Sequence, residues 1–257
     1  MTQPRWTVIT GASSGIGAEM ARLFGQRGSW LVIVARRGDR LDALKQEIVA
    51  AQTVKVETIV LDLEQPNAPE ALVQTLEERG ITVHTLVNNA GFGLRGGFGT
   101  MPYDDQIALV QLNIFALTKL CRLVLPGLVA RRQGGIINLA STAAFQPVPY
   151  MAAYAASKAY VLSLSEALHE EAKAAGVTVT ALCPGPTATE FTKRADMEKS
   201  KLFSRAAAAP DVARHGIDGY EAGRAVVVTG AVNQFGTWMV KLMPRALVRW
   251  GAGKLQG

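Results

Sequence analysis

The chain has 257 residues, of which 49% are hydrophobic, and this size and apolar content suit one α/β domain with a sizeable core. Its formal net charge of +6 comes from scattered residues without any nucleic-acid-binding motif, so we expect no nucleic-acid partner. We also expect neither a membrane span nor a signal peptide, because no uninterrupted apolar run is long enough and the first residues run almost directly into a strand.

Short apolar strands alternate with helical stretches along the whole chain. The strands are rich in Val and Ile, which is typical of strands buried on both faces. We predict them over residues 6–10, 30–35, 54–60, 83–87, 135–140, 177–182 and 225–229. The predicted helices cover 14–28, 39–51, 67–79, 103–132, 151–175 and 211–222. This alternation predicts one domain, 1–257, with a Rossmann-like doubly wound parallel sheet of about seven strands and helices on both faces.

A glycine-rich turn follows the first predicted strand and opens the first predicted helix. Its spacing is Gly11-x-x-x-Gly15-x-Gly17, with Ser13, Ser14 and Ile16 between the glycines. Without Cβ atoms, the backbone amides and the helix N-terminus can approach a pyrophosphate closely. The turn therefore indicates a dinucleotide-binding site, and a tight connection without a ligand is the alternative.

The second predicted strand ends with Ala35-Arg36-Arg37. An acidic residue at this point would bind the adenosine ribose and repel a 2′-phosphate. Ala35 takes that place, whereas Arg36 and Arg37 offer forked donors that suit phosphate. A hydroxyl of Ser13 or Ser14 can add to them. We therefore expect NADP(H) to be preferred over NAD(H), and if one of the two arginines is idle, we expect it to be Arg37.

Tyr154 and Lys158 are four residues apart on a predicted helix, and Ser141 stands thirteen residues before Tyr154. Side chains at positions i and i+4 share one helix face, so the phenol and the ammonium can meet. The ammonium and the positive ring of an oxidised nicotinamide would together lower the pKa of the phenol from about 10 toward neutrality. A core tyrosine, a solvated lysine and a capping serine are the alternatives for each residue alone. The combination predicts a hydride-transfer enzyme.

Together these residues resemble the short-chain dehydrogenase/reductase family, in its shorter single-domain branch. The resemblance spans about residues 10–190 and continues through Asp62-Leu63, Asn88-Asn89-Ala90-Gly91, Asn113 and Pro184-Gly185-x-x-x-Thr189. It implies that Tyr154 is the general acid in carbonyl reduction and the general base in the reverse oxidation. The other catalytic roles implied are a hold on the nicotinamide ribose for Lys158, orientation of the substrate carbonyl for Ser141, and a water linking Lys158 to solvent for Asn113.

Cofactor contacts are implied for three further segments, which run from the adenine edge through the adenosine ribose to the carboxamide. In that order they are Asp62 with the Leu63 backbone, then Asn89, Ala90 and Gly91, and then Pro184, Gly185, the Thr187 backbone and the Thr189 hydroxyl. Asn88 is expected to be structural. The segment 184–209 follows a strand end where ligands bind in such sheets, so we expect a substrate flap, with an ordinary long connection as the alternative.

The expected substrate pocket is apolar. Its candidate lining residues are Phe92, Leu94, Ala143, Phe145, Pro147, Met151, Phe191 and Met197. Of these, Phe145 and Phe191 are expected to contact the substrate together with Ser141 and Tyr154. We therefore expect a lipophilic ketone or aldehyde, or the matching alcohol, and a 3-oxoacyl thioester remains open. A non-catalytic NADP-sensing interaction protein on the same fold is the alternative to an enzyme.

The C-terminal tail, 231–257, shows an amphipathic helical pattern that Pro244 is expected to kink or divide. Its apolar stripe is Phe235, Trp238, Met239, Leu242, Met243, Ala246, Leu247 and Trp250, with Lys241, Arg245 and Arg249 on another side. We expect this stripe to pack on the body or on another subunit rather than on a membrane through 235–250. The resemblance implies a homodimer or homotetramer that pairs through 103–132 and 151–175.

The cysteines and histidines carry no signal of metal or redox chemistry. Cys121 and Cys183 are the only cysteines, and neither they nor His84, His169 and His215 have metal-ligand spacing. We expect no metal site and a cytoplasmic setting, where thiols stay reduced.

Overall fold

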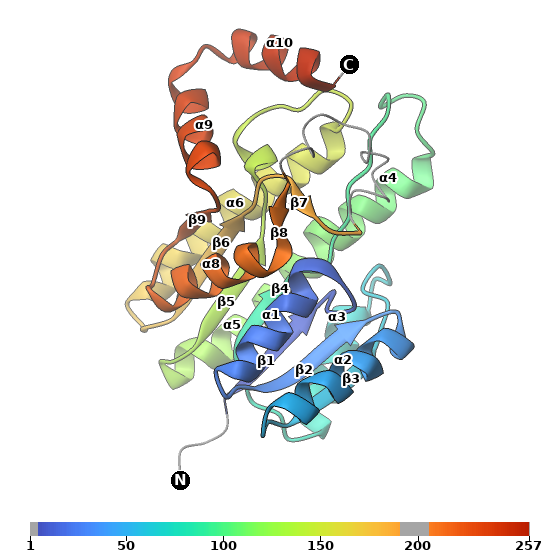
Figure 1. The fold of residues 1–257 in the computed structure, drawn as a ribbon, viewed down its shortest axis with the longest axis vertical. Helices are drawn as coiled ribbons and strands as arrows, with labels where there is room; N and C mark the ends of the chain where they lie inside the picture. Colours follow the sequence, from blue (N-terminus) through green and yellow to red (C-terminus); the bar gives the residue numbers. More distant parts are fainter. Residues whose placement is uncertain (1–4, 191–205, 257) are drawn as a thin grey trace.

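A computed structural model describes residues 5–190 and 206–256. Its centre is a seven-stranded sheet with the strand order β3-β2-β1-β4-β5-β6-β9, in which every pairing is parallel (Figure 1). The strands are β1 Trp6–Thr10, β2 Trp30–Ala35, β3 Val56–Val60, β4 Val83–Asn88, β5 Gly135–Leu139, β6 Thr178–Cys183 and β9 Val226–Val228. The prediction of a doubly wound parallel sheet of about seven strands is confirmed.

Helices cover the sheet on both faces because its strands are apolar on both. In β2, four consecutive residues from Leu31 to Val34 are fully buried, although successive side chains point to opposite faces. One core, which includes Phe24 and Leu41, lies under α1 Gly15–Gln26, α2 Gly38–Ala51 and α8 Ala209–Glu221. The other, which includes Leu72 and Val161, lies under α3 Ala68–Glu78, α5 Leu117–Arg131 and α6 Ala152–Lys173.

The order of the strands determines at which edge of the sheet a ligand can bind. β1 lies between β2 and β4, so the chain winds in opposite directions on its two sides. The loops after β1 and β4 therefore diverge to opposite faces and leave a crevice at the carboxyl ends of the strands. The glycine turn follows β1 and Asn89 follows β4, which brings two of the predicted cofactor segments to this crevice.

The long helix predicted over 103–132 is divided in the structure. It consists of α4 Tyr103–Val110, a π-helical turn η1 Gln111–Ala116 and α5. A π-helical turn inserts an extra residue and re-aims the side chains around it, and such turns are frequent at functional sites. Sequence periodicity did not reveal this turn, because a single inserted residue changes the apolar pattern very little.

The stretch Tyr103–Arg131 is long and apolar enough to cross a membrane by length and composition alone. It is not the uninterrupted apolar run that our expectation concerned, because Gln111, Asn113, Lys119 and Arg122 interrupt it. In the structure it packs along the sheet, where Leu109, Leu120 and Leu128 are buried in the core. Burial against the sheet accounts for its apolar composition.

Short elements border the crevice. A 3₁₀ turn, η2 Thr142–Phe145, follows β5, and two-residue strands β7 Thr187–Ala188 and β8 Ala207–Ala208 pair in parallel. This pair joins the two described ends of the expected flap, whose residues 191–205 lie outside the described part of the chain.

The tail forms two helices, α9 Ala231–Leu242 and α10 Arg245–Gln256, on either side of Pro244, as the proline predicted. Figure 1 shows them beyond the crevice edge of the sheet. Phe235, Trp238 and Trp250 are exposed, so these side chains do not pack on the body, and the alternative that the stripe packs on another subunit stays a prediction. A different face of α9, on which Thr237 is buried, packs against the body.

Candidate active site

A cavity of about 760 Å³ lies at the crevice edge of the sheet. Most of the predicted site residues line it: Gly11, Ser13, Ser14, Gly15, Ile16, Arg36, Arg37, Asp62, Leu63, Asn89, Ala90, Gly91, Ser141, Phe145, Tyr154, Lys158, Pro184, Gly185, Thr187 and Thr189. Gly17 and Asn113 stand behind its wall, and Phe191 lies outside the described residues. The structure thus brings the residues of the glycine turn and of the helix α6 to one space.

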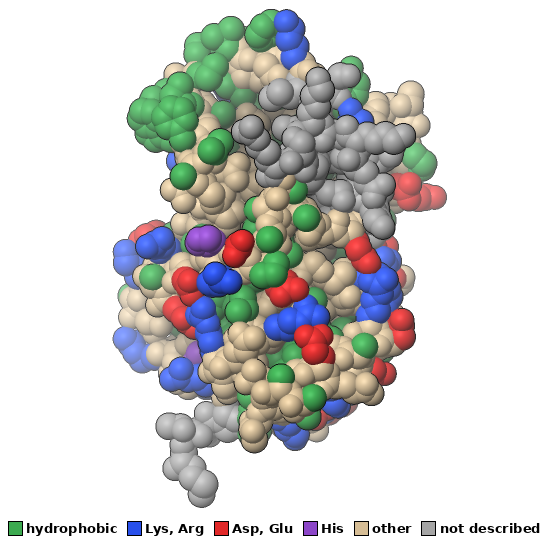
Figure 2. Space-filling view, viewed as in Figure 1, with side chains coloured by type: hydrophobic (Ala, Val, Ile, Leu, Met, Phe, Trp, Pro, Cys, Tyr) green, Lys and Arg blue, Asp and Glu red, His purple; other side chains and the backbone are tan. Residues whose placement is uncertain are grey.

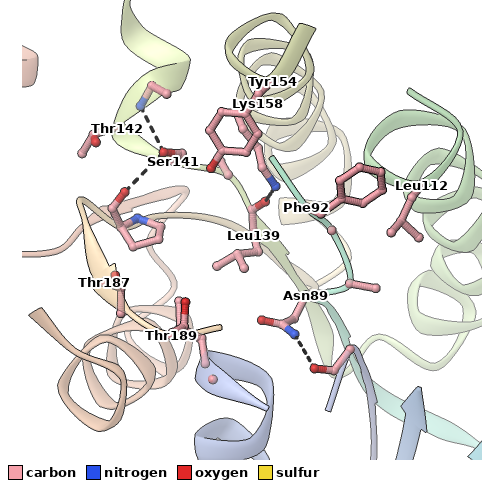
Figure 3. A pocket seen from close by; sticks show the side chains of 18 of the residues that line it. Asn89, Phe92, Leu112, Leu139, Ser141, Thr142, Tyr154, Lys158, Thr187 and Thr189 are labelled. Atoms are coloured by element: carbon pink, nitrogen blue, oxygen red, sulfur yellow. Dashed lines mark hydrogen bonds between the residues drawn. The ribbon is translucent and has the colours of Figure 1, made fainter. Parts of the chain in front are cut away.

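The glycine turn is packed too closely for side chains. A Cβ atom on Gly17 would lie 2.4 Å from Asn89 Nδ2 and 2.5 Å from the carbonyl oxygen of Gly11. Gly11 adopts a φ of +66°, and its Cβ would lie 2.8 Å from the Cα of Ala90. Asn89 Nδ2 fastens the turn by donating to the carbonyl oxygens of Thr10 (2.9 Å) and Gly11 (3.1 Å) (Figure 3). The contacts explain why glycine is required at both positions.

The first turn of α1 lines the cavity. Ser14 is its N-cap residue, but its side chain makes no capping hydrogen bond to the helix amides. These amides carry the positive end of the helix dipole, so this end of the cavity suits an anion such as a pyrophosphate.

Arg37 is held at the glycine turn. Its guanidinium donates to Ser13 Oγ (2.9 Å) and Ser14 Oγ (3.1 Å) and pairs with the Glu190 carboxylate (2.8 Å). Arg40 pairs with the same carboxylate, and the hydrogen bonds from Arg40 and Arg37 lower the pKa of Glu190 to about 2. The charge-assisted bonds favour the ionised form. Arg37, which we expected to be the idler arginine, thus makes direct contacts with the turn.

Arg36 points its guanidinium to a different carboxylate. It donates to Glu64 Oε1 (3.0 Å) and lies 4.0 Å from Asp62 Oδ1, which itself accepts from the backbone amide of Glu64 (3.1 Å). We did not predict Arg40, Glu64 or Glu190 from the sequence. Arg40 stands one helical turn after Arg37, and this spacing was the one signal that could have placed it at the site.

Three polar side chains meet in the cavity at the end of β5 and on α6. Tyr154 and Lys158 lie on the same face of α6, and Lys158 Nζ is 5.8 Å from the centroid of the Tyr154 ring (Figure 3). Lys158 Nζ donates to the carbonyl oxygen of Leu139 (2.7 Å), which fixes its position. Ser141 caps η2, where its Oγ accepts from the amide of Ala143 (3.1 Å). The hydroxyl of Tyr154 is hydrogen-bonded to Ser141.

Burial governs the protonation of Tyr154 and Lys158. It raises the pKa of Tyr154 to about 12, against a smaller lowering by the hydrogen bond to Ser141. Burial also lowers the pKa of Lys158 to about 8. Both shifts arise because a charged form loses hydration in the protein interior. The expected lowering of the phenol's pKa depends on the oxidised nicotinamide together with Lys158, so it stays a prediction; in the chain by itself, desolvation of the phenolate has the largest effect.

Asn113 sits in the π-helical turn η1 and is buried. Its Nδ2 donates to the carbonyl oxygen of Phe92 (3.0 Å) and to Ser157 Oγ (3.1 Å), and its Oδ1 accepts from the Phe92 amide (3.2 Å). A Cβ on Gly91 would lie 2.9 Å from Asn113 Oδ1 and 3.6 Å from Lys158 Nζ. Asn113 therefore fixes the loop after β4 directly beneath the ammonium of Lys158. The proton relay expected through Asn113 stays a prediction.

The 184–190 loop closes the cavity from the opposite side. Thr187 Oγ1 donates to the carbonyl oxygen of Gly185 (2.9 Å), and the side chain of Thr189 packs against Gly15 of the glycine turn. Asn233 of α9 lies against Gly185, where a Cβ would be 2.3 Å from Asn233 Nδ2. The loop is thus clamped between α1 and α9.

The remaining wall of the cavity is largely apolar. Among the expected lining residues, Phe92, Ala143, Phe145 and Met151 line it, Leu94 and Pro147 do not, and Phe191 and Met197 are outside the described residues. The sequence analysis missed the contribution of Val148 and of the tail: Val232, Asn233, Gly236, Thr237, Val240 and Ala252. Asn233, Gly236, Thr237 and Val240 have the i, i+3, i+4, i+7 spacing of one helix face, which was a usable signal.

Comparison with known proteins places this geometry in a family. The sequence model described as "short chain dehydrogenase" matches residues 5–200. The very-long-chain 3-oxoacyl-CoA reductase of Bos taurus is 35% identical over 192 residues, which are 73% of this chain and 61% of that protein. The chain therefore spans about 61% of the length of such curated relatives.

Two further relatives have more nearly the size of this chain. Sulfoacetaldehyde reductase 2 of Chromohalobacter salexigens is 37% identical over 187 residues, which are 72% of this chain and 73% of that protein. The short-chain dehydrogenase from Sphingobium yanoikuyae, solved in complex with NADPH, is 33% identical, covers 93% of both chains and superimposes with a TM-score of 0.84. The chain belongs to the short-chain dehydrogenase/reductase family.

Proposed function

We propose that the chain is an NADP(H)-dependent oxidoreductase that interconverts a lipophilic ketone or aldehyde and its alcohol. The observation that carries the proposal is the position of the Tyr154 hydroxyl, which lies beside Ser141 and Lys158 in the same cavity as the glycine turn. A proton donor and a dinucleotide cradle in one cavity are what a carbonyl reductase requires.

The described residues fit a phosphorylated dinucleotide. Gly11 and Gly17 leave the backbone bare, and the first turn of α1 offers its amides to the pyrophosphate. Arg36 and Arg37 line the same end of the cavity, next to Ser13. Asp62, Asn89 and the 184–189 loop would hold the remainder of the nucleotide. When bound, the nicotinamide ring supplies or accepts the hydride.

The polar side chains of the cavity transfer the proton of the reaction. In carbonyl reduction the Tyr154 hydroxyl donates its proton to the substrate oxygen, and in alcohol oxidation the phenolate takes that proton back. Ser141 donates a hydrogen bond to the same oxygen and so orients it, while the Lys158 ammonium stabilises the phenolate. A water held near Asn113 would return a proton through Lys158. Burial raises the pKa of Tyr154 to about 12 in the chain without cofactor, so the phenol is in its proton-donating form at neutral pH.

We infer the substrate class from the residues that line the cavity, because the relatives are named for very different compounds. One is named for very-long-chain 3-oxoacyl-CoA and another for sulfoacetaldehyde. Among the described lining residues, the basic ones are Arg36, Arg37 and Lys158, and Phe145, Val148 and Met151 line the wall near Tyr154. This wall favours a neutral, lipophilic carbonyl group, and the bovine relative supports including 3-oxoacyl thioesters among the candidates.

Cofactor choice is tested at Arg37. Arg37→Ala is expected to raise KM for NADPH about 10- to 100-fold, because a charge-assisted bond to phosphate contributes about 1.5–3 kcal/mol. KM for NADH, which lacks the phosphate, should change little. Steady-state kinetics with both cofactors provide the measurement, and Arg36→Ala in parallel decides which arginine contributes more. Arg214→Ala, on the exposed face of α8, is the matched control. Equal losses for NADPH and NADH in both site variants would contradict a phosphate site here.

We infer a homodimer or homotetramer in the cytoplasm. The helices α4, α5 and α6 and the π-helical turn η1 expose apolar side chains that no described part of the chain covers: Tyr103, Ile107, Phe115, Leu123, Val129 and Tyr160. Phe115→Glu is expected to convert the assembly to a smaller species, because it buries a charge in the contact. Light scattering after gel filtration measures the mass, with Val49→Glu on α2 as control. An unchanged mass for Phe115→Glu would contradict pairing through these helices. The thiols of Cys121 and Cys183 are both free and buried.

A further inference from the structure

The outer surface of the tail exposes five large side chains of the apolar stripe, which are Phe235, Trp238, Leu242, Leu247 and Trp250. Each of these side chains is more than half exposed, from 53% for Leu247 to 65% for Leu242. Figure 2 shows hydrophobic side chains gathered over α9 and α10, at the end of the molecule beyond the cavity. A soluble protein rarely exposes so many large apolar residues together to water, so we expect this surface to contact a partner.

The stripe is not a by-product of loosely packed helices. α9 rests on the body through Thr237, and Gly236 and Val240 on its inner side line the cavity. α10 is anchored through Val248 and Ala252, which are both buried. Each helix therefore has one face that holds it to the fold and a second apolar face that packing does not require.

The charged side chains of α9 and α10 themselves are all positive. Lys241, Arg245, Arg249 and Lys254 lie on the same two helices, and the chain has no Asp or Glu after Glu221. Lys254 Nζ is 4.2 Å from the centroid of the Trp250 ring, so one cation and one aromatic ring occupy the same spot of the surface. Exposed aromatic and aliphatic side chains bordered by basic residues are typical of helices that lie in a lipid interface.

A second copy of the chain fits this surface poorly. An isologous contact would place the basic residues of one tail against those of the other, with no acidic residue in either tail to pair with them. An anionic lipid surface, in contrast, complements the cations and accepts the apolar stripe.

We propose that α9 and α10 dock the protein on an anionic lipid surface, with the apolar stripe inserted at the headgroup level and Arg245, Arg249 and Lys254 facing lipid phosphates. This reverses the expectation from the sequence, which favoured protein packing. Because the inner side of α9 lines the cavity, docking would also set the cavity close to the lipid. A lipophilic substrate could then enter from the membrane, a consequence that rests on the proposed function, whereas the docking does not.

Vesicle flotation of the whole chain tests the docking without reference to activity. We expect the protein to float with vesicles of phosphatidylcholine and phosphatidylserine, far less with phosphatidylcholine alone, and less as salt is added. The double variant Trp238→Ser with Trp250→Ser is expected to lower the partition coefficient at least about tenfold, since two aromatic rings no longer enter the interface. Val49→Ser, which removes an exposed apolar side chain from α2, should bind like the unmodified protein.

The basic residues are tested separately. Arg245→Gln with Arg249→Gln should weaken binding to the mixed vesicles about 30-fold, from about 1 kcal/mol for each basic residue near an anionic surface. Lys173→Gln with Arg214→Gln removes the same charge elsewhere on the protein and should bind normally. All these side chains are exposed, so unchanged thermal unfolding is expected to confirm that each variant is folded. Failure to bind mixed vesicles, equal binding by the tryptophan variant, or loss of self-association in that variant in place of vesicle binding would overturn the proposal.

Discussion

Tyr154→Phe is expected to lower kcat for carbonyl reduction by about 10²- to 10⁴-fold, the usual contribution of a positioned general acid. Phenylalanine keeps the ring that forms part of the cavity wall but lacks the hydroxyl hydrogen-bonded to Ser141. NADPH binding should therefore change little, so kcat falls while the cofactor still binds. Steady-state turnover and a fluorescence titration of NADPH measure the two quantities on the same sample.

Tyr160→Phe is the matched control for this variant. Tyr160 lies on the same helix, but its hydroxyl is hydrogen-bonded to Thr118 at the exposed side of α6 (2.9 Å). Its removal should leave turnover unchanged. If Tyr154→Phe retains normal turnover, another group donates the proton. If NADPH binds tightly and neither protein turns over any carbonyl, the alternative of a non-catalytic NADP sensor is supported instead.

Lys158→Met is expected to abolish most activity and, at the same time, to stabilise the fold. Holding a buried ammonium whose pKa is about 8 instead of the ordinary 10.5 costs about 3 kcal/mol at neutral pH. Loss of the hydrogen bond to the Leu139 carbonyl offsets about 1 kcal/mol of the gain. The free energy of unfolding should therefore rise by about 2 kcal/mol at pH 7. An active-site lysine that costs stability is a common compromise between function and folding.

The pH dependence of this gain separates the buried charge from simple repacking. The lowered pKa of Lys158 means that the folded state releases its proton first, at about pH 8, while the unfolded chain keeps its proton up to about pH 10.5. The stability of the unmodified protein should rise over this range, and the advantage of Lys158→Met should shrink accordingly. Urea unfolding at pH 7 and pH 10 measures it, with the exposed Lys173→Met as control. A variant that is less stable at pH 7, or an advantage independent of pH, would contradict the account.

Much of the fold could be predicted because its signals are local. Strands buried on both faces read as short continuous apolar runs, such as Leu31–Val34, and the glycine turn and the Tyr154–Lys158 pair have spacings that local backbone geometry dictates. The two-residue strands β7 and β8 carry no such signal, because two residues show no periodicity. The π-helical turn around Asn113 was missed for a similar reason.

The features of the site that we did not predict depend on contacts between distant parts of the chain. Glu190 forms an ion pair with Arg37, which is 153 residues away in the sequence, and no local sequence pattern predicts this pair. Lys158 and an oxidised nicotinamide are expected to lower the pKa of Tyr154 together, whereas in the chain by itself desolvation of the phenol raises it. The inner side of α9 lines the cavity because the tail folds back over the crevice. The amphipathic pattern of the sequence shows that α9 has distinct faces, but it does not show which face meets the cavity.

The most direct test of the proposed chemistry is a carbonyl panel with NADPH and NADH side by side, in which oxidation of the reduced cofactor is followed. The panel should contain long-chain and aromatic ketones and aldehydes, steroid-like ketones and 3-oxoacyl thioesters. We expect at least one lipophilic carbonyl to be reduced, with kcat/KM higher for NADPH than for NADH. Consumption of neither cofactor with any member of the panel would contradict the assignment, and a strong preference for NADH would contradict the phosphate site at Arg36 and Arg37.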